Sequence, residues 1–326
     1  MNSSRRIIYA LAVAFAAAVS AQAQQTGPLR LRADNVADWH ESERSDRFTG
    51  GRIERAELQP DDPNVWVTLN VPSFRLTLWQ DGREVKSYFV GVGMKDHPIV
   101  IGWREAHEVI WNPAWIPPDS PWVAEMKGVR AGEVIKASDA RNPLGKLKIP
   151  LGGAYLIHQA KGAGDLGNLV SHGCVRMLKS DLYDLAEKIA AARSLPVTHK
   201  QIERAKTTTK TLYAKLDPAL VVDINYDTQV VEGGRLHLYP DVYGRNTATV
   251  ESVRAELRAS GADTSNLEDA TVRQMLARVT RKQQFVVDVR SIEEGRALED
   301  GRVLPIVEQP APRRTNARHR PAGAGR

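Results

Sequence analysis

The single cysteine of this 326-residue chain stands in a setting that suits nucleophilic chemistry. Cys174 follows Gly173, with His172 just before the glycine and His158 further upstream. A thiol with an ordinary pKa of ~8.5 is mostly protonated at neutral pH, so a cysteine nucleophile needs a base nearby. Gly173 lets the backbone approach a substrate or adopt a positive φ. The pattern predicts Cys174 as a nucleophile with a histidine as its base.

Two other interpretations compete with this one. A lone cysteine is often an inert, buried small hydrophobe. His158, His172 and Cys174 together would also offer metal ligands, although no carboxylate or second cysteine stands at ligand spacing. One cysteine excludes an intramolecular disulfide and any multi-cysteine zinc or iron–sulfur site. We interpret the other histidines as ordinary polar residues, since none has a cysteine near it in sequence: His40, His97, His107, His199, His237 and His319.

The segments around these residues show mostly strand patterns. Apolar residues alternate with polar ones over 65–69 and 74–78, which predicts two half-buried strands. Asp81-Gly82 is a hairpin signal, and 85–92 supplies the returning strand. A further strand over 153–158 ends at His158.

Residues 97–122 are predicted to form an ordered loop, because they combine four tryptophans with several prolines. Their tryptophans (Trp103, Trp111, Trp115 and Trp122) either line a groove or only pin the loop to the core.

A helix follows the cysteine in the predicted order of elements. Ser180 is a candidate cap, and Leu182, Leu185, Ala186 and Ile189 have helical spacing. Residues 197–199 are predicted to form a closing strand. Beyond residue 200 the patterns predict strands at 220–224, 236–238 and 285–289, with helices at 250–258 and 270–279. This mixture predicts a smaller α+β module over 201–305, whose role the sequence does not reveal.

The residues around Cys174 resemble a known catalytic signature. His158 and the block Ser171-His172-Gly173-Cys174-Val175-Arg176-Met177 are similar to the L,D-transpeptidase catalytic domain of the YkuD type. That signature is a histidine at a strand end, a spacer, and then Ser/Thr-His-Gly-Cys followed by an apolar residue and Asn or Arg. The segments 71–76, 90–93, 115–118 and 142–145 also fit the family, and the resemblance covers about residues 63–200.

The resemblance implies a mainly β fold: a YkuD-like β-sandwich of mixed sheets with a capping helix. It implies that Cys174 forms a thioester, that His158 acts as base, and that the amides around Gly173 hold the oxyanion. It further implies that His172 orients the site or contacts the substrate. Ser171 and Arg176 are interpreted as substrate contacts, with Arg176 equally able to brace the loop. No cofactor or metal is implied.

The substrate implied by the resemblance is a peptidoglycan stem tetrapeptide, cut between its third residue, typically meso-diaminopimelate, and the terminal D-Ala. The acceptor amine is left open: diaminopimelate, a free D-amino acid, or a lysine of an outer-membrane protein or lipoprotein. Water as acceptor would make the enzyme a carboxypeptidase. A same-fold hydrolase or amidase and a non-catalytic peptidoglycan-binding envelope protein are the alternative functions.

Two segments depart from the family pattern and put the substrate or acceptor detail in doubt. His158-Gln159-Ala160 stands where members often have His-Gly-Thr. Residues 96–102 replace a Thr-Pro-Thr-Pro-x-Gly stretch.

The two ends of the chain carry its positive charge. Arg5 and Arg6, a short apolar run and Ala21-Gln22-Ala23 predict a cleaved signal peptide over 1–23 and hence a periplasmic location, without a transmembrane anchor. Residues 24–62 are expected to be an extended lead-in, and 306–326 a disordered basic tail. Without Arg5, Arg6 and the five arginines of the tail, the formal charge falls from +6 to −1. The near-neutral body argues against nucleic-acid binding.

Overall fold

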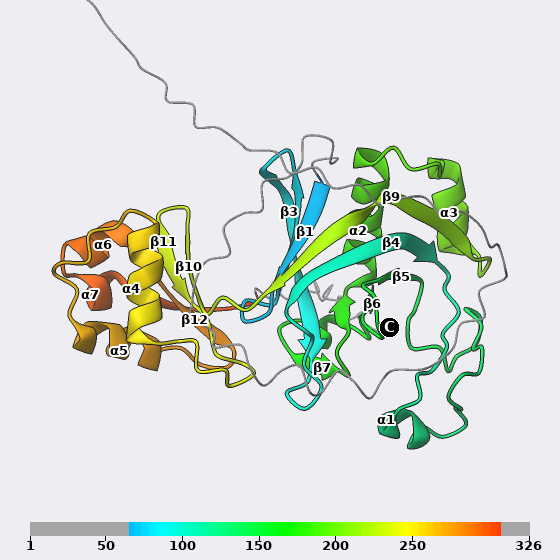
Figure 1. Ribbon diagram of the computed structural model, residues 1–326, viewed down its shortest axis with the longest axis horizontal. Helices are drawn as coiled ribbons and strands as arrows, with labels where there is room; N and C mark the ends of the chain where they lie inside the picture. The colour runs from blue at the N-terminus through cyan, green and yellow to red at the C-terminus, as the bar shows by residue number, and fades with distance from the viewer. Residues whose placement is uncertain (1–64, 308–326) are drawn as a thin grey trace, which may run out of the picture. The chain divides into compact units, whose positions relative to one another are not determined.

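The structure is a computed structural model that describes residues 65–307 (Figure 1). The predicted signal peptide, the lead-in and the basic tail from residue 308 lie outside the described residues. Within 65–307, every helix is too short or too polar to cross a lipid bilayer.

Three strands form the N-terminal part of the main sheet, as the alternating pattern predicted. They are β1 (Val65–Asn70), β2 (Arg75–Gln80) and β3 (Arg83–Gly93). Along β1, every second side chain is buried because one face of the strand packs into the core. Asp81 and Gly82, both at positive φ, form the turn between β2 and β3.

The main sheet has nine strands and closes on itself. Its order is β2-β1-β9-β4-β5-β6-β8-β3-β7, and β3 also pairs with β2. The strands after β3 are β4 (Gly102–Trp111), β5 (Leu147–Pro150), β6 (Leu156–Gln159), β7 (Leu169–Ser171), β8 (Val175–Met177) and β9 (Leu212–Asn225). Both parallel and antiparallel pairs occur, which confirms a mainly β fold with mixed pairing.

The predicted loop over 97–122 is wrong for its middle part. Residues 102–111 form β4, which pairs antiparallel with β9 and β5. The prolines of this region stand at 98 and from 113 onward, so they flank a proline-free stretch that can form a full hydrogen-bond ladder. The rest of the segment contains only the short helix α1 (Pro121–Ala124).

Two helices follow the cysteine. The first, α2 (Lys179–Ala192), buries Leu182, Leu185, Ala186 and Ile189, the residues that the helical spacing selected. The predicted strand at 197–199 is wrong: Thr198 caps α3 (His199–Thr207) through a capping box with Gln201. The hydroxyl of Thr198 accepts from the Gln201 amide, which satisfies a helix donor that a strand would not have.

Strand β9 contributes a central strand from beyond residue 200. It pairs parallel with β1 and antiparallel with β4, and Figure 1 shows it running between them. Its residues Leu220, Val222 and Ile224 belong to the same buried cluster as the residues of β1 and β2. The main sheet therefore extends past the point where the motif-bearing region ends.

The C-terminal residues form a second, smaller sheet with its own core. Its antiparallel order is β10 (Gln229–Glu232), β11 (Arg235–Leu238), β12 (Gln283–Asp288) and β13 (Arg302–Pro305). The accompanying helices are α4 (Val250–Ala259), α5 (Asp269–Ala277), α6 (Val289–Glu293) and α7 (Ala297–Asp300). A separate buried cluster around Leu257 and Phe285 holds them together. An α+β module at the C-terminal end is thereby confirmed.

Candidate active site

Cys174 occupies a tight turn between β7 and β8. Gly173 adopts φ +105°, a conformation that residues with a side chain rarely adopt. A Cβ at Gly173 would lie 2.7 Å from the Tyr155 ring, so the turn also needs the space that glycine leaves. Of the two roles that the sequence left open for Gly173, the structure shows the positive φ, and both constraints fix the direction in which Cys174 leaves the turn.

An internal hydrogen bond braces the same turn. Ser171 is 2% exposed, and its hydroxyl donates to the carbonyl of Cys174 at 2.6 Å. The carbonyl of Ser171 accepts from the Met94 amide at 2.8 Å. These contacts fit a bracing role for Ser171 better than the substrate contact that the sequence suggested.

The Cys174 thiol lies in a partly buried, polar surrounding. Its Sγ is 3.8 Å from the carbonyl oxygen of Ala154. Burial raises the pKa of the thiol, while the backbone of Leu156 and the charge of Arg176 act in the opposite direction. No backbone hydrogen bond between described residues uses the amide of Gly173 or Cys174. These two N–H groups suit an oxyanion site.

His158 lies on the strand next to the cysteine turn. Strands β6 and β8 are parallel neighbours, and His158 pairs in register with Arg176. The imidazole is 4% exposed, and burial followed by the charge of Arg176 lowers its pKa to about 4. At neutral pH the ring is uncharged, the form that can accept a proton. Between residues 65 and 307, no hydrogen bond links this ring to the Cys174 thiol, a link that often tightens only when substrate binds.

Arg176 forms an ion pair rather than pointing freely toward a substrate. Its Nη1 lies 3.2 Å from Oδ2 of Asp165, and both side chains are less than 15% exposed. The same carboxylate oxygen accepts the Lys161 amide at 2.8 Å. The guanidinium thus anchors the Asp165 turn next to His158, which fits the bracing alternative.

His172 lies on the outside of the turn, within an aromatic group. Its ring stacks on Trp122 at 4.4 Å between centroids and meets the edge of His97 at 4.7 Å. Partial burial, then His97 and Arg176, lower the pKa of His172. Trp122 stacks in turn on Trp115. The sequence offered Trp122 as a groove residue but left His97 as an ordinary polar histidine, since no local pattern reveals a contact across 75 residues.

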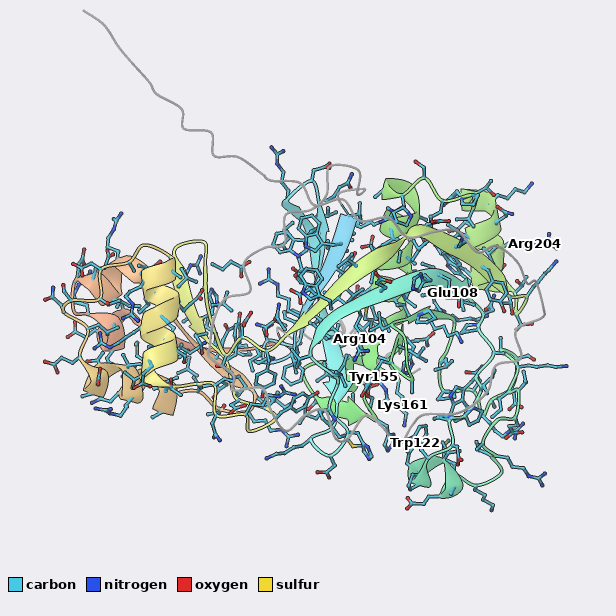
Figure 2. The ribbon with its side chains drawn as sticks, in the orientation of Figure 1. Arg104, Glu108, Trp122, Tyr155, Lys161 and Arg204 are labelled. Carbon is cyan, nitrogen blue, oxygen red and sulfur yellow. The ribbon has the colours of Figure 1, made fainter. Side chains whose placement is uncertain are left out.

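Tyr155 and Arg104 flank the turn on another side. The guanidinium carbon of Arg104 lies 5.2 Å from the centroid of the Tyr155 ring, and Figure 2 shows the two side chains close together. Tyr155 contacts Gly173, so this cation–π pair borders the turn that carries Cys174. Arg104 has no ion-pair partner among the described residues.

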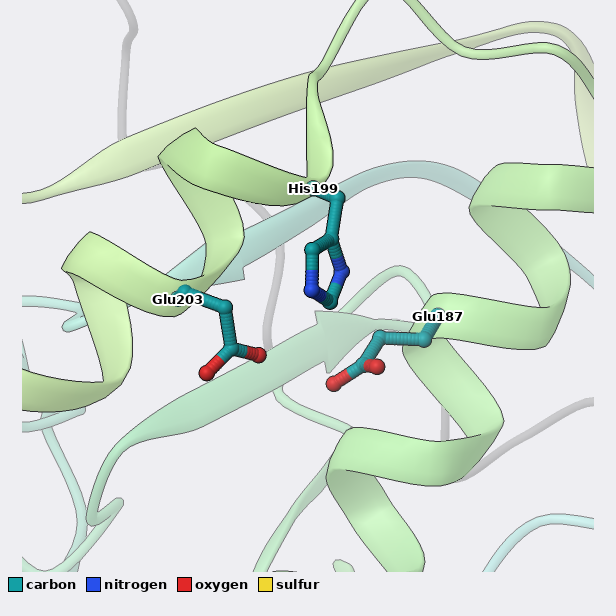
Figure 3. A group of neighbouring side chains, drawn as sticks. All are labelled: Glu187, His199 and Glu203. Atoms are coloured by element: carbon teal, nitrogen blue, oxygen red, sulfur yellow. The ribbon is translucent and has the colours of Figure 1, made fainter.

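The three candidate metal ligands of the motif do not converge. Within residues 65–307, the group whose ligand atoms do lie within 4.8 Å of one another is Glu187, His199 and Glu203 on α2 and α3 (Figure 3). Lys206 already pairs with both carboxylates, at 2.5 Å from Glu187 and 2.6 Å from Glu203. An ammonium group therefore neutralises this cluster.

A comparison with known proteins identifies the family of the segment that contains Cys174 and His158. Residues 64–211 match the model of the YkuD family, described as the L,D-transpeptidase catalytic domain. This segment is an L,D-transpeptidase catalytic domain of the YkuD family. The match ends just before β9, so the main sheet of this transpeptidase domain draws one more strand from the residues that follow.

The curated relatives share the transpeptidase domain but differ widely in sequence. The chain is 28% identical over 137 residues to the probable L,D-transpeptidase YbiS of Escherichia coli K12, covering 40% of this chain and 44% of the relative. It is 25% identical over 155 residues to the probable L,D-transpeptidase YcfS of the same strain, covering 45% and 48%. The chain thus spans about half the length of the curated relatives it matches.

Among solved structures, an L,D-transpeptidase from Mycobacterium smegmatis is 13% identical, with a TM-score of 0.30 over 50% of this chain and 58% of that one.

Proposed function

We propose that this chain is a periplasmic L,D-transpeptidase that transfers peptidoglycan stem peptides through a thioester on Cys174. The observation that carries the proposal is the nucleophile turn: a cysteine set by a positive-φ glycine, beside a strand that bears an uncharged histidine. The family of residues 64–211 supports the same chemistry. The predicted signal peptide supports the location.

In the first half-reaction, the Cys174 sulfur attacks the carbonyl carbon between the third stem residue and D-Ala. His158 takes the thiol proton as the S–C bond forms, so no free thiolate is needed beforehand. The amides of Gly173 and Cys174 stabilise the oxyanion, and such donors contribute ~10²–10³ in rate each. The C–N bond then breaks, and His158 returns the proton to the amine of the departing D-Ala.

In the second half-reaction, an acceptor amine attacks the thioester. His158 removes a proton from the attacking nitrogen, the C–S bond breaks, and the thiol is restored. The thioester keeps the acyl group reactive without an external energy source. The product is a cross-link, an exchanged D-amino acid or a protein–peptidoglycan bond, according to the amine.

The charges around the turn suit a peptide that carries carboxylates. Arg104 lies over Tyr155 beside Gly173, and Lys148 pairs in register with His158, so its side chain leaves the same face of the sheet. Burial lowers the pKa of Lys148, and Glu108 opposes that effect. The side chain of diaminopimelate carries one carboxylate and one ammonium group. Arg104 and Lys148 could attract that carboxylate, and Glu108 could attract that ammonium group.

The decisive experiment follows muropeptides by mass spectrometry. The purified protein, Cys174→Ala, His158→Ala and the control His107→Ala, at an exposed histidine of β4, are incubated with tetrapeptide muropeptides. We expect D-Ala release and a 3–3 dimer with the parent protein and the control. The thioester mass should be trapped on Cys174 and absent in Cys174→Ala.

Other products would replace the proposal with a defined alternative. D-Ala release without a dimer, even with added D-amino acids or lysine-bearing peptides, would indicate a hydrolase. Binding of muropeptides without any cleavage would indicate a peptidoglycan-binding protein. A loss of activity in His107→Ala equal to that in His158→Ala would remove the special role of His158.

A further inference from the structure

Tyr243, far from the motif in sequence, is held rigidly in the part of the chain that follows the transpeptidase domain. It is 7% exposed, and its ring stacks on Tyr226 with 5.6 Å between centroids. The amide of Tyr243 donates to the Tyr226 hydroxyl at 2.6 Å. That hydroxyl donates to Asp241 at 2.6 Å. These contacts fix the orientation of the Tyr243 side chain.

The Tyr243 hydroxyl closes a loop of the transpeptidase domain. It donates to the carbonyl of Gly93 at 3.1 Å and accepts from the amide of Ile99 at 3.3 Å. Gly93 and Ile99 flank residues 94–98, so one side chain joins both ends of this loop. Burial raises the pKa of Tyr243 to about 12, so the hydroxyl keeps the proton that it donates.

The loop over 94–98, together with the flanking Gly93, contacts the turn that carries Cys174 at three points. The Met94 amide donates to the carbonyl of Ser171. The ring of His97 meets the ring of His172. Gly93, at the start of the loop, packs so closely that a Cβ there would lie 2.9 Å from the Cα of Gly173. A shift of this loop would reach the residues on both sides of Cys174.

Packing alone leaves one side of this loop without support. Met94 and Lys95 line a cavity of about 710 Å³, together with residues from the C-terminal module such as Tyr239 and Leu276. A loop beside open space has few apolar contacts to hold its position, so its hydrogen bonds matter more. Inside the loop the His97 amide donates to the Met94 carbonyl at 3.0 Å, and the two bonds of Tyr243 join the residues that flank the loop.

We propose that Tyr243 is a positioning residue for the reaction at Cys174, acting through the 94–98 loop and His97. The proposal gives a role to residues that follow the catalytic segment and that no motif marked. It rests on the proposed transpeptidase activity for its kinetic readout, but its structural readout does not. Because a displacement of about 1 Å at a reacting group can cost ~10²-fold in rate, we expect a loss of about tenfold from a loosened loop.

The first test removes only the hydroxyl. Tyr243→Phe should lower kcat for D-Ala release about tenfold with KM changed less than twofold. Tyr88→Phe is the matched control, since it removes a hydroxyl that donates to Asp184 at 2.7 Å from a side chain that is 3% exposed. An equal loss of kcat in both variants would overturn the proposal.

The second test needs no substrate. In histidine-labelled protein, Tyr243→Phe should shift or broaden the ring signals of His97 and His172 and leave those of His107 and His199 in place. Unchanged His97 and His172 signals would overturn the proposal even if transpeptidation is never detected. If these signals shift but no turnover is detected, the contact from Tyr243 to the loop is supported and the proposed transpeptidase activity is rejected.

A double-mutant cycle tests whether His97 carries the effect. His97→Ala alone should lower kcat, and adding Tyr243→Phe should then cost less than twofold more. Additive losses would overturn the route through His97. Should Tyr243→Phe fail to fold, the exposed His97→Ala variant still decides, since an unchanged kcat there would overturn the proposed route through His97.

Discussion

His158 and Arg176 lie opposite each other on the parallel strands β6 and β8, so a buried imidazole faces a guanidinium. Burial and this positive charge both disfavour the imidazolium, and the pKa of His158 falls to about 4. Asp165 pairs with Arg176 and limits the effect. The arrangement keeps the proposed base uncharged over the whole neutral range.

The activity should therefore decrease only at low pH. We expect kcat/KM for D-Ala release to fall below half of its plateau near pH 4, because protonation of His158 removes the base. Arg176→Gln removes a charge that lowers the pKa of His158. The acid limb of the pH–activity curve of this variant should therefore move from pH 4 toward pH 6.5. A limb at pH 6.5 in the parent protein would contradict the buried, uncharged imidazole.

The free energy of unfolding should also depend on the protonation of His158, and it should decrease as the pH falls. The pKa of His158 is lower in the folded than in the unfolded protein, so its contribution to the free energy of unfolding is present above about pH 6.5. It is lost as the pH falls toward 4, by about 3 kcal/mol in total. Denaturant titrations of the parent and His158→Gln should show a steeper decline in the parent. His107→Gln, at an exposed histidine, serves as the control.

The pair between Arg176 and Asp165 should contribute far more than a surface pair. Both side chains are less than 15% exposed, so Arg176→Gln leaves a carboxylate largely without water, at a cost of about 3 kcal/mol. Lys215→Gln breaks a pair whose side chains are 76% and 75% exposed, so we expect the free energy of unfolding of this variant to stay close to that of the parent protein. Chemical denaturation of both variants checks the contrast, which equal losses would refute.

Gly173 should not tolerate even a methyl group. Gly173→Ala forces a side chain at φ +105° and places Cβ 2.7 Å from the Tyr155 ring, so we expect loss of muropeptide turnover and a lower melting temperature. Gly82→Ala shares the positive φ but has no atom within 4 Å of the new Cβ. It should cost only ~1–2 kcal/mol of backbone strain and leave activity intact. Full activity in Gly173→Ala would contradict the close packing of the turn.

Trp122 should control the environment of His172. Trp122→Ala removes the stacked ring, which reduces the burial that lowers the pKa of His172, and that pKa should rise toward its ordinary value. Titration of the His172 ring signal by NMR measures the change. Trp103→Ala, at a side chain that is 50% exposed, is the control and should leave the His172 titration unmoved.

Elements with a local signal could be predicted from the amino-acid sequence. Period-two burial along 65–69 and helical spacing from Leu182 to Ile189 predict β1 and α2, because each element buries one face against a single core. Gly173 before Cys174 allows a positive φ, which the structure shows, because that freedom depends on the glycine alone. The short motif was therefore enough to predict the nucleophile and to identify the family of the domain.

The residues that come from distant parts of the chain to meet at this motif could not be predicted in the same way. Strand β4 was missed because its neighbours in sequence are prolines, whereas its stability comes from pairing with β9 more than 100 residues later. His97 and Tyr243 reach the site through contacts that close long loops of chain, and Asp165 reaches it through an ion pair with Arg176 on a neighbouring strand. Such contacts depend on the closure of the whole sheet rather than on local periodicity, so no pattern in the sequence records them.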